Sequence, residues 1–331
     1  MHDENGGTWF VPSGSRPEDG WTDVVDGRLD GWAHTGIRVG TLVGSPDASR
    51  SAPASRNAPG HETDVQPTGA AELRLPSDAV ERIVVPLSGT FTVTHDGASS
   101  SGTVVLEGRR SVFDGPTDTL YLGAHTGASI IGTGRVAVAE APTDTVKPAT
   151  YVPAAAVPVE LRGAGQSSRQ VHNFGTPAAL DAAKLIVCEV ITPAGNWSSY
   201  PPHKHDRLVP GAESDLEEIY YYEAAVTRGA VGEVPADADP FALHRAYASD
   251  DRPIDEFREV RTGDIALVPY GWHGPAVAAP GYDMYYLNVM AGPDPERVWN
   301  ITDDPAHGWV RRQWVSEAID PRLPYQKETA S

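Results

Sequence analysis

Short runs of valine, isoleucine, leucine, threonine and tyrosine recur along the chain, separated by glycine, proline and aspartate. This pattern, without long helical periodicities, predicts an all-β sandwich or barrel. Strands are expected in two groups, at residues 82–85, 90–95, 103–106, 119–122 and 135–140, and at residues 184–192, 218–224, 257–260, 265–269 and 282–290. Helices should be few and short, with residues 176–183 and 310–318 as the better candidates.

Two breaks in this pattern organise the chain. Residues 142–158 are rich in alanine, proline, threonine and valine, which predicts an interdomain linker. The chain then divides into an N-terminal unit, residues 1–150, and a C-terminal unit, residues 151–331, whose similar strand content suggests a duplicated barrel. Residues 45–60 are low in complexity and lack a periodic apolar face, so we expect a flexible surface loop there.

The balance of charge excludes one class of partner. The 331 residues include 26 Lys and Arg against 45 Asp and Glu, a formal net charge of −19. A nucleic-acid partner needs clustered basic residues, whereas one arginine or a metal ion can hold an anionic small molecule. The single cysteine, Cys188, lies among aliphatic residues and is interpreted as a core residue. No apolar stretch approaches the roughly 18 residues of a membrane span and no signal peptide is evident, so we expect a cytoplasmic protein.

Three segments carry residues with metal-ligand chemistry. His203 and His205 are one residue apart in an extended segment, so both imidazoles point to the same side. Glu218 opens a strand rich in tyrosine, and His273 follows a strand that ends in a Pro-x-Gly turn. Three imidazoles and one carboxylate suit zinc, manganese, iron or nickel, with zinc as the first choice because it needs no redox protection.

These segments resemble the two cupin motifs, His-x-His…Glu and Gly-(five residues)-Pro-x-Gly-x-His. The string Thr-Pro-Ala-Gly-Asn-Trp-Ser-Ser-Tyr-Pro-Pro-His-Lys-His-Asp at residues 192–206, with residues 216–222 and 281–293, is similar to the hallmark of the 5-deoxyglucuronate isomerase family of myo-inositol catabolism. The resemblance covers most of the chain after about residue 31 and is densest from residue 162 to residue 309. It implies a bicupin fold with a metal in the second barrel.

The resemblance also implies an enzyme, an aldose–ketose isomerase that converts 5-deoxy-D-glucuronate to 5-dehydro-2-deoxy-D-gluconate. A metal ion suits this reaction because it binds neighbouring carbonyl and hydroxyl oxygens and stabilises the enediolate that forms. The residues leave two alternatives open. One is an isomerase of another uronate, such as the ketol-isomerase of pectin breakdown. The other is a metal-dependent cupin dioxygenase, which uses similar ligands.

The first barrel shows no His-x-His segment. His95 and His125 lie near strand ends without partners at ligand spacing, and we expect both to face solvent. The N-terminal cupin is therefore expected to lack metal ligands and to serve in structure and oligomerisation. Because barrels with exposed edge strands often pair, we expect a homo-oligomer.

Candidate acid–base groups flank the expected ligands. Tyr220 and Tyr222 share a strand face with Glu218, so each is expected beside the metal, where it either relays a proton or packs the barrel. Glu217 faces the opposite way and should be solvated. Lys204 lies between two expected ligands and is a catalytic candidate. In an extended segment, however, its side chain points away from the metal, toward an acidic partner or the rim of the barrel.

The remaining candidates concern charge inside the second barrel. Glu189 lies in an apolar strand, where it is either a base or the partner of Arg169 or Lys184. Arg169 and Arg245 are the candidates for the substrate carboxylate, because a guanidinium grips a carboxylate through two hydrogen bonds. The last strand of the barrel would complete the substrate pocket with Tyr286 and Asn288.

Overall fold

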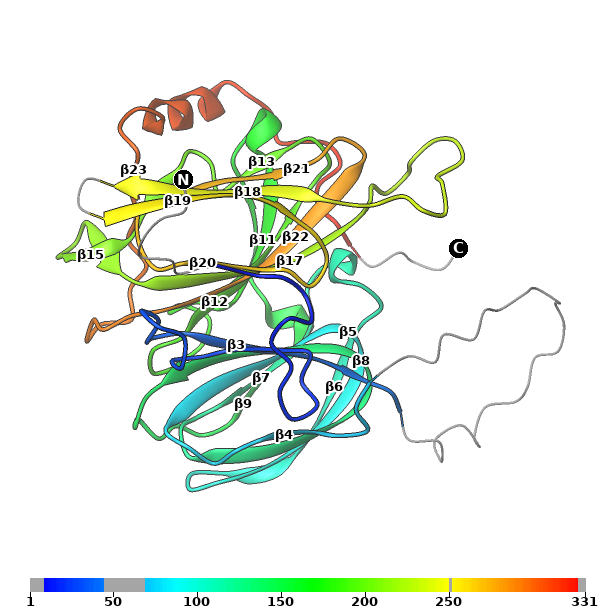
Figure 1. Cartoon of the computed structure of the whole chain (residues 1–331), viewed down its shortest axis with the longest axis vertical. Coiled ribbons are helices and arrows are strands. Elements are labelled where there is room, and N and C mark those ends of the chain that lie inside the picture. The colour runs from blue at the N-terminus through cyan, green and yellow to red at the C-terminus, as the bar shows by residue number, and fades with distance from the viewer. Residues whose placement is uncertain (1–8, 45–68, 250–251, 327–331) are drawn as a thin grey trace, which may run out of the picture.

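The computed structural model describes residues 9–44, 69–249 and 252–326, which form two β-sheet lobes (Figure 1). The lower lobe is one eight-stranded antiparallel sheet in the order β2-β3-β8-β5-β7-β9, with β4 paired to β8 and β6 paired to β5. Its strands are β2 (Asp23–Val25), β3 (Gly36–Leu42), β4 (Leu73–Leu75), β5 (Val80–Gly97), β6 (Ser101–Arg109), β7 (Thr119–Leu122), β8 (Thr126–Pro142) and β9 (Thr150–Val152).

The upper lobe in Figure 1 contains two larger sheets. The seven-stranded sheet runs in the order β1 (Phe10–Val11), β20 (Ile265–Val268), β17 (Glu217–Val226), β22 (Tyr282–Ala291), β12 (Ile186–Thr192), β11 (Arg169–Gly175) and β10 (Val159–Arg162). The six-stranded sheet runs in the order β19 (Arg252–Val260), β18 (Ala242–Ser249), β21 (Trp272–Ala278), β14 (His203–Lys204) and β23 (Thr302–Asp303), with β13 (Trp197–Ser198) paired to β21. A two-stranded ribbon joins β15 (Asp206–Val209) and β16 (Glu213–Asp215).

The pairing of strands qualifies the expected division of the chain. β9 pairs with β7 in the lower lobe and β10 pairs with β11 in the upper lobe, so the sheets change near residue 150. β1, however, pairs with β20, which places the first described strand on the upper lobe. The boundary at residue 150 stays a prediction, and the expected loop at residues 45–60 lies outside the described residues.

Three clusters of buried side chains form the core, and one of them joins the two lobes. One fills the lower lobe with residues such as Val84, Phe91 and Val138, and another fills the space between the two upper sheets. The largest combines residues of both lobes, including Ile83 and Leu287, and lies where the two lobes meet. Because side chains alternate along a strand, a central strand contributes residues to two clusters. On β17, Tyr220 lies inside the upper lobe and Tyr221 lies at the contact between the lobes.

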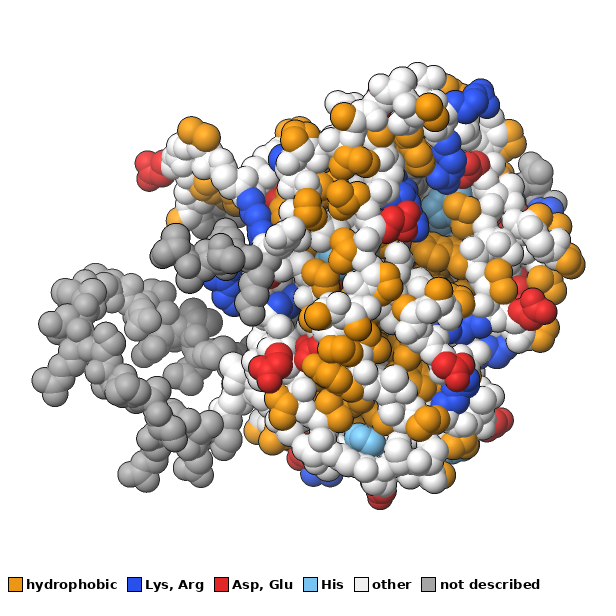
Figure 2. Space-filling view, turned by 180° about the vertical axis from the view of Figure 1, so that it is seen from behind, with side chains coloured by type: hydrophobic (Ala, Val, Ile, Leu, Met, Phe, Trp, Pro, Cys, Tyr) orange, Lys and Arg blue, Asp and Glu red, His pale blue; other side chains and the backbone are white. Residues whose placement is uncertain are grey.

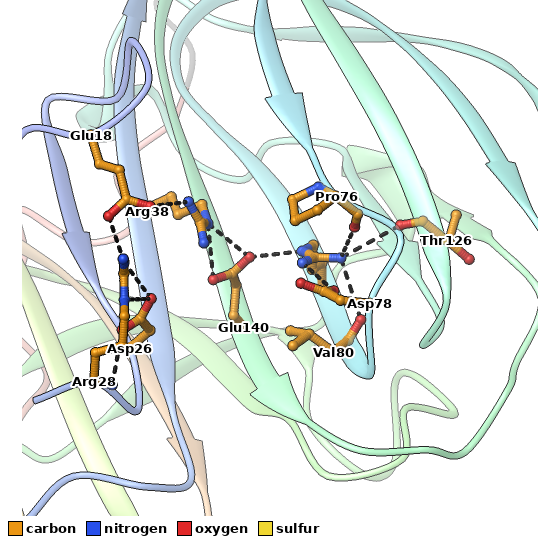
Figure 3. A network of polar contacts seen from close by, with 10 residues as sticks. Glu18, Asp26, Arg28, Arg38, Pro76, Asp78, Val80, Thr126 and Glu140 are labelled. Atoms are coloured by element: carbon orange, nitrogen blue, oxygen red, sulfur yellow. Dashed lines mark hydrogen bonds and ion pairs between the residues drawn. The ribbon is translucent and has the colours of Figure 1, made fainter.

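A network of charged side chains links β3, β8 and β5 of the lower lobe (Figure 3). The fully buried Arg82 on β5 donates to Glu140 on β8 at 2.7 Å and to Asp78 at 2.6 Å. Glu140 also accepts from Arg38 on β3 at 3.0 Å, and Arg38 lies 3.8 Å from Glu18. The carboxylate of Glu140 therefore balances two guanidinium groups and ties three strands together.

Each expected strand overlaps a strand of the structure, whereas only one of the two expected helices does form, as a 3₁₀ helix. Residues 82–85 and 90–95 belong to one long strand, β5. The described residues contain no α-helix, only short 3₁₀ helices: η2 (Val112–Asp114), η3 (Ala154–Ala156), η4 (Gly165–Ser167) and η5 (Gly308–Val315). The helix expected at residues 176–183 is wrong, because this segment is a series of turns and bends. The helix expected at residues 310–318 corresponds to η5.

The surface shows no gathering of charge on the face seen in Figure 2, where basic and acidic side chains are scattered over both lobes. Across the described ranges, no helix is long and apolar enough to cross a membrane.

Candidate metal centre and its cavity

Strands of both upper sheets bring the candidate ligands together. His203 begins β14 and pairs in register with His273 on β21. Glu218 lies on β17 of the seven-stranded sheet, which packs against these strands. Gly271 has a φ of +87°, a conformation that favours glycine, and its amide donates to Asp206 Oδ2 at 2.8 Å. This bond holds the turn from which His273 extends.

The three imidazoles form a compact buried cluster. One ring nitrogen from each of His203, His205 and His273 lies within 4.8 Å of the other two. Nε2 of His205 lies 2.9 Å, and Nε2 of His273 lies 3.0 Å, from Glu218 Oε2. In the part of the chain that the structure describes, no other group of three His, Cys, Asp or Glu side chains has this geometry. The structure thus brings together the four ligands expected from the sequence.

Nδ1 of each ring contacts a backbone oxygen, which leaves Nε2 as the nitrogen available to a cation, although Nε2 of His205 also lies within hydrogen-bond distance of Glu218. Nδ1 of each ring faces a backbone carbonyl oxygen, at 3.4 Å for His203 and Pro201, 3.1 Å for His205 and Leu216, and 3.3 Å for His273 and Gly271. A carbonyl oxygen only accepts, so Nδ1 carries the ring proton and Nε2 presents a lone pair. Within the described residues, Nε2 of His273 has no hydrogen-bond partner, although it lies 3.0 Å from the Glu218 carboxylate. Several acceptors around one point fit a metal with nitrogen and oxygen ligands.

The ionisation of His203 and Glu218 also fits a metal site. In His205, burial lowers the pKa, but contact with the Glu218 carboxylate outweighs burial and raises it above 6.5. Burial, together with repulsion from His273 and His205, holds the pKa of His203 well below 6.5, so its ring is neutral. Burial raises the pKa of Glu218, but its contacts with His205 and His273 outweigh burial and keep the pKa well below 4.5. A neutral imidazole and an ionised carboxylate are the forms that bind metals.

A cavity of about 210 Å³ adjoins this cluster. Its lining combines two of the candidate ligands with arginines, hydroxyl groups and aliphatic side chains. These residues are Arg162, Arg169, Val171, Val190, Ser199, His203, Glu218, Tyr220, Tyr286, Asn288, Trp299, Ile301 and Arg311. The cavity is therefore able to hold a small anionic and hydroxylated molecule next to a metal.

Arg169 is a buried cation without an acidic partner. It is 5% exposed, donates to Ser167 O at 2.9 Å and lies 5.6 Å from the centroid of the Trp314 ring. No carboxylate among the described residues lies within ion-pair distance of it. Burial, with repulsion from Arg162 and Arg311, lowers the pKa of Arg169 to about 10, so it stays charged at neutral pH. An unpaired buried guanidinium in a cavity marks a site for an anion.

The other two cavity arginines are paired. Arg162 donates to Glu160 at 2.8 Å and lies over the ring of Trp299, whose buried Nε1 has no partner. Arg311 on η5 donates to both carboxylate oxygens of Asp303 on β23. Their acidic partners balance these two arginines and hold them in place, which leaves Arg169 as the cavity arginine without a carboxylate partner among the described residues.

Hydroxyl groups lie next to the candidate metal ligands. The hydroxyl of Tyr220 lies 2.8 Å from Ser199 Oγ, and that of Tyr286 lies 2.5 Å from Ser198 Oγ. Ser199 has a φ of +49°, which a residue with a side chain rarely adopts, so the fold holds it there at some cost. Tyr220, Tyr286 and the expected Asn288 line the cavity, and their hydroxyl and amide groups can bind substrate hydroxyls.

Tyr222 occupies the predicted strand face but does not line the cavity. Its hydroxyl lies 2.8 Å from Nδ1 of His244, and the two form a buried pair stacked beside Tyr220. Burial lowers the pKa of His244 to about 3, so its ring is neutral. Tyr222 therefore packs the interior of the barrel rather than the cavity wall.

Glu189 is placed in a different network from the one expected. Its carboxylate accepts two hydrogen bonds from Arg109 on β6, at 2.8 and 2.6 Å, and others from His172 and Tyr285. Neither Arg169 nor Lys184 is its partner. These bonds join the two lobes, and Glu189 is fully buried and absent from the cavity lining. The geometry therefore favours the structural alternative for Glu189 over a role as a base, with Arg109 as the partner.

Lys204 and Arg245 also lie away from the cavity. The ammonium group of Lys204 bonds to Asp206 at 2.7 Å and to Glu213 at 2.6 Å, so it has the acidic partner expected for a lysine that points away from the metal. Arg245 pairs with the exposed Asp255 across the β18–β19 hairpin. Of the two arginines expected to bind a carboxylate, the structure brings only Arg169 to the cavity.

Two expectations of solvent exposure are wrong. Glu217 is 8% exposed, because its carboxylate accepts hydrogen bonds from three successive amides, those of Ala33, His34 and Thr35. His95 is buried on the face of β5 that fills the lower lobe, while His125 is partly exposed as expected. For Glu217, the covering segment is distant in sequence, at residues 33–35.

Sequence reasoning missed several cavity residues: Arg162, Ser199, Trp299 and Arg311. For Arg162 a signal exists, because it stands opposite Arg169 in the β10–β11 hairpin, two arginines on one face. Arg311 lies on η5 and Trp299 in an irregular segment, both near the C-terminus, and no local sequence pattern predicts how these segments pack on the barrel.

Comparison with known proteins gives a family. Residues 63–310 match the KduI/IolB family. The 5-deoxy-glucuronate isomerase of Geobacillus thermodenitrificans is 48% identical over 163 residues, 49% of this chain and 54% of that protein. That of Shouchella clausii is 39% identical over 253 residues, 75% of this chain and 85% of that protein. The chain thus aligns with about half the length of the first relatives that it matches.

Solved structures agree on the fold. An IolB-like protein from Salmonella typhimurium LT2 superposes with a TM-score of 0.72 at 32% identity, over 91% of this chain and 98% of that one. The oxalate decarboxylase of Lactobacillus farciminis superposes with a TM-score of 0.55 at 11% identity, over 89% of this chain and 88% of that one. The second likeness concerns the fold alone, and together they confirm the expected all-β bicupin. On this fold and on the match over residues 63–310, the chain belongs to the KduI/IolB family.

Proposed function

We propose that this protein is a metal-dependent aldose–ketose isomerase that converts 5-deoxy-D-glucuronate to 5-dehydro-2-deoxy-D-gluconate. The observation that carries the proposal is the cavity, which combines a candidate metal centre with the unpaired guanidinium of Arg169. The relatives' name, 5-deoxy-glucuronate isomerase, describes a substrate with an aldehyde at one end and a carboxylate at the other. Each end of that molecule has a chemically matched group in the cavity.

The reaction needs little from the protein besides binding and proton transfer. One hydrogen moves from carbon 2 to carbon 1, and one proton moves from the oxygen of carbon 2 to that of carbon 1, with no net oxidation. His203, His205, Glu218 and His273 would hold the metal. When bound, a metal supplies polarisation of two neighbouring oxygens, which makes the hydrogen on carbon 2 more acidic.

The cavity residues would orient the sugar acid. Arg169 would bind the carboxylate through two charge-assisted hydrogen bonds. Tyr220 lies next to Glu218 on the same strand face, with Ser199 fixing its hydroxyl, so it would bind or donate a proton to a hydroxyl near the metal. Tyr286 and Asn288 would bind the remaining hydroxyls. Burial of all these groups would keep water from competing for them.

We further propose zinc as the bound ion and a homo-oligomer as the assembly. Zinc fits three imidazoles and one carboxylate, as do manganese, iron and nickel. Metal analysis of the purified protein therefore tests the identity of the ion. Light scattering measures the molar mass in solution and so tests the homo-oligomer.

An anaerobic assay tests the function. Purified protein is incubated with 5-deoxy-D-glucuronate, with and without a chelator, and the ketose and the exchange of hydrogen on carbon 2 are followed by NMR. We expect turnover without oxygen that the chelator abolishes and added metal restores. Absence of turnover by metal-loaded protein would refute the proposed substrate, and a requirement for oxygen would refute the isomerase.

A further inference from the structure

The floor of the cavity changes from polar to apolar across neighbouring strands. Tyr220 on β17 pairs in register with Asn288 on β22, and Tyr286 on β22 pairs with Val190 on β12. Val190 pairs in turn with Val171 on β11. All five side chains line the cavity. Asn288 and Tyr286 are two residues apart on β22, so these pairs lie in two neighbouring rows that together step diagonally across the sheet.

Two arginines lie one step further along β11 and β10. Arg169 precedes Val171 by two residues on β11, so both point to the same face, and Arg169 pairs in register with Arg162 on β10. Glu218 occupies the opposite end, on β17. In spatial order, the floor therefore presents a metal-ligand carboxylate, hydroxyl and amide groups, two valines, and two guanidinium groups.

The proposed substrate has its functional groups in the same order. Carbons 1 and 2 carry the reacting oxygens, carbons 3 and 4 carry hydroxyls, carbon 5 is a methylene, and carbon 6 is the carboxylate. With the reacting end at the metal and the carboxylate at Arg169, the methylene lies over the valines. D-glucuronate differs only by a hydroxyl on carbon 5, which would meet two aliphatic side chains.

We propose that Val171 and Val190 select for the missing hydroxyl on carbon 5, an inference that rests on the proposed function. Both valines are at least 96% buried, and neither offers a hydrogen bond to a substrate hydroxyl. Ile301 adds a third aliphatic wall. The unpartnered Nε1 of Trp299 does not serve this position, because the Trp299 ring lies against Arg162 at the carboxylate end.

Threonine substitutions test this proposal, because threonine keeps the shape of valine and adds a hydroxyl. The measured quantity is the ratio of kcat/KM for 5-deoxy-D-glucuronate to kcat/KM for D-glucuronate, in the wild type and in Val171→Thr and Val190→Thr. Comparing ratios cancels losses of folded protein and the different open-chain fractions of the two sugars. Val93→Thr is the matched control, since Val93 is equally buried but fills the other lobe.

We expect the wild type to prefer the deoxy sugar by roughly 10²-fold, the discrimination that an apolar pocket achieves against an added hydroxyl. At least one of the two threonine variants should lower this ratio about tenfold, the effect of one new hydrogen bond. Val93→Thr should leave it unchanged. An unchanged ratio in both cavity variants, or an equal fall in the control, would overturn the proposal.

A binding experiment separates this proposal from the proposed function. The two sugar acids are reduced at the aldehyde, which makes them unable to isomerise, and their affinities for metal-loaded protein are measured by calorimetry. Tighter binding of the deoxy compound, lost in a threonine variant, supports the valine pair even if neither sugar is turned over. Equal binding of both compounds by the wild type contradicts it, whatever the activity.

Discussion

Replacing Arg169 with methionine should have opposite effects on binding and on folding. Burial lowers the pKa of Arg169 from 12.5 to about 10. At about 1.36 kcal/mol per pKa unit, the charged form costs the folded chain about 3 kcal/mol, and this cost is fully present at pH 7, below both values. The cost declines only as the pH rises from about 10 toward 12.5. Methionine has similar length and no charge, so Arg169→Met should leave the free energy of unfolding unchanged or raise it by up to about 3 kcal/mol.

The same substitution should remove most of the activity. Without Arg169, the substrate carboxylate would enter a buried cavity and lose its two charge-assisted hydrogen bonds. Loss of such a partner costs about 3 to 4 kcal/mol, which corresponds to a fall of roughly 10²- to 10³-fold in kcat/KM for 5-deoxy-D-glucuronate. Stability is followed by urea unfolding and activity by initial rates of ketose formation.

Arg245 offers a matched control. It pairs with an exposed aspartate on the β18–β19 hairpin and lies outside the cavity. Exposed pairs contribute at most about 1 kcal/mol, so Arg245→Met should keep kcat/KM within about twofold of the wild type. Full activity in Arg169→Met, or a larger loss in Arg245→Met, would refute the assignment of Arg169 to the carboxylate.

Four further substitutions test the metal ligands, the cavity tyrosine and the buried carboxylate. His273→Ala should retain the circular dichroism of the wild type but lose bound metal and turnover; metal-loaded, active protein would contradict it. Tyr220→Phe should lower kcat/KM about 10- to 100-fold and Tyr222→Phe much less, because only Tyr220 lines the cavity; equal losses would count against this distinction. Glu189→Gln should lower the free energy of unfolding at pH 7 by about 3 kcal/mol, because the folded pKa of Glu189 is about 2 against 4.5. The carboxylate stabilises the fold above pH 4.5 and loses this effect as the pH falls toward 2, so the urea midpoints of wild type and variant should converge there.

The candidate ligands could be predicted because their geometry is local. His203 and His205 are one residue apart, and alternation along a strand places both on one side. The same rule places Glu218 and Tyr220 inside the barrel, as the structure has them. For His273, the Pro-x-Gly turn before the strand was enough. Spacing along the chain and side-chain direction carry this information without any knowledge of the tertiary fold.

The partners of buried charges could not be predicted in this way. Glu189 was expected to pair within its own half of the chain or to act as a base, but its partner, Arg109, comes from β6 of the other lobe. Glu217 follows the expected alternation and still is not solvated, because residues 33–35 cover it. An alternating pattern tells which face a side chain takes, but which segment covers that face depends on how the lobes pack.

Titrating metal into protein stripped by a chelator tests the central claim most directly. Bound metal per chain and initial rate of 5-deoxy-D-glucuronate isomerisation are measured in the same samples. The rate should rise in proportion to bound metal and reach its maximum at one ion per chain, and His273→Ala should bind no ion and show no rate at any concentration. Full activity in stripped protein, or activity restored equally in the variant, would contradict a metal centre formed by these residues.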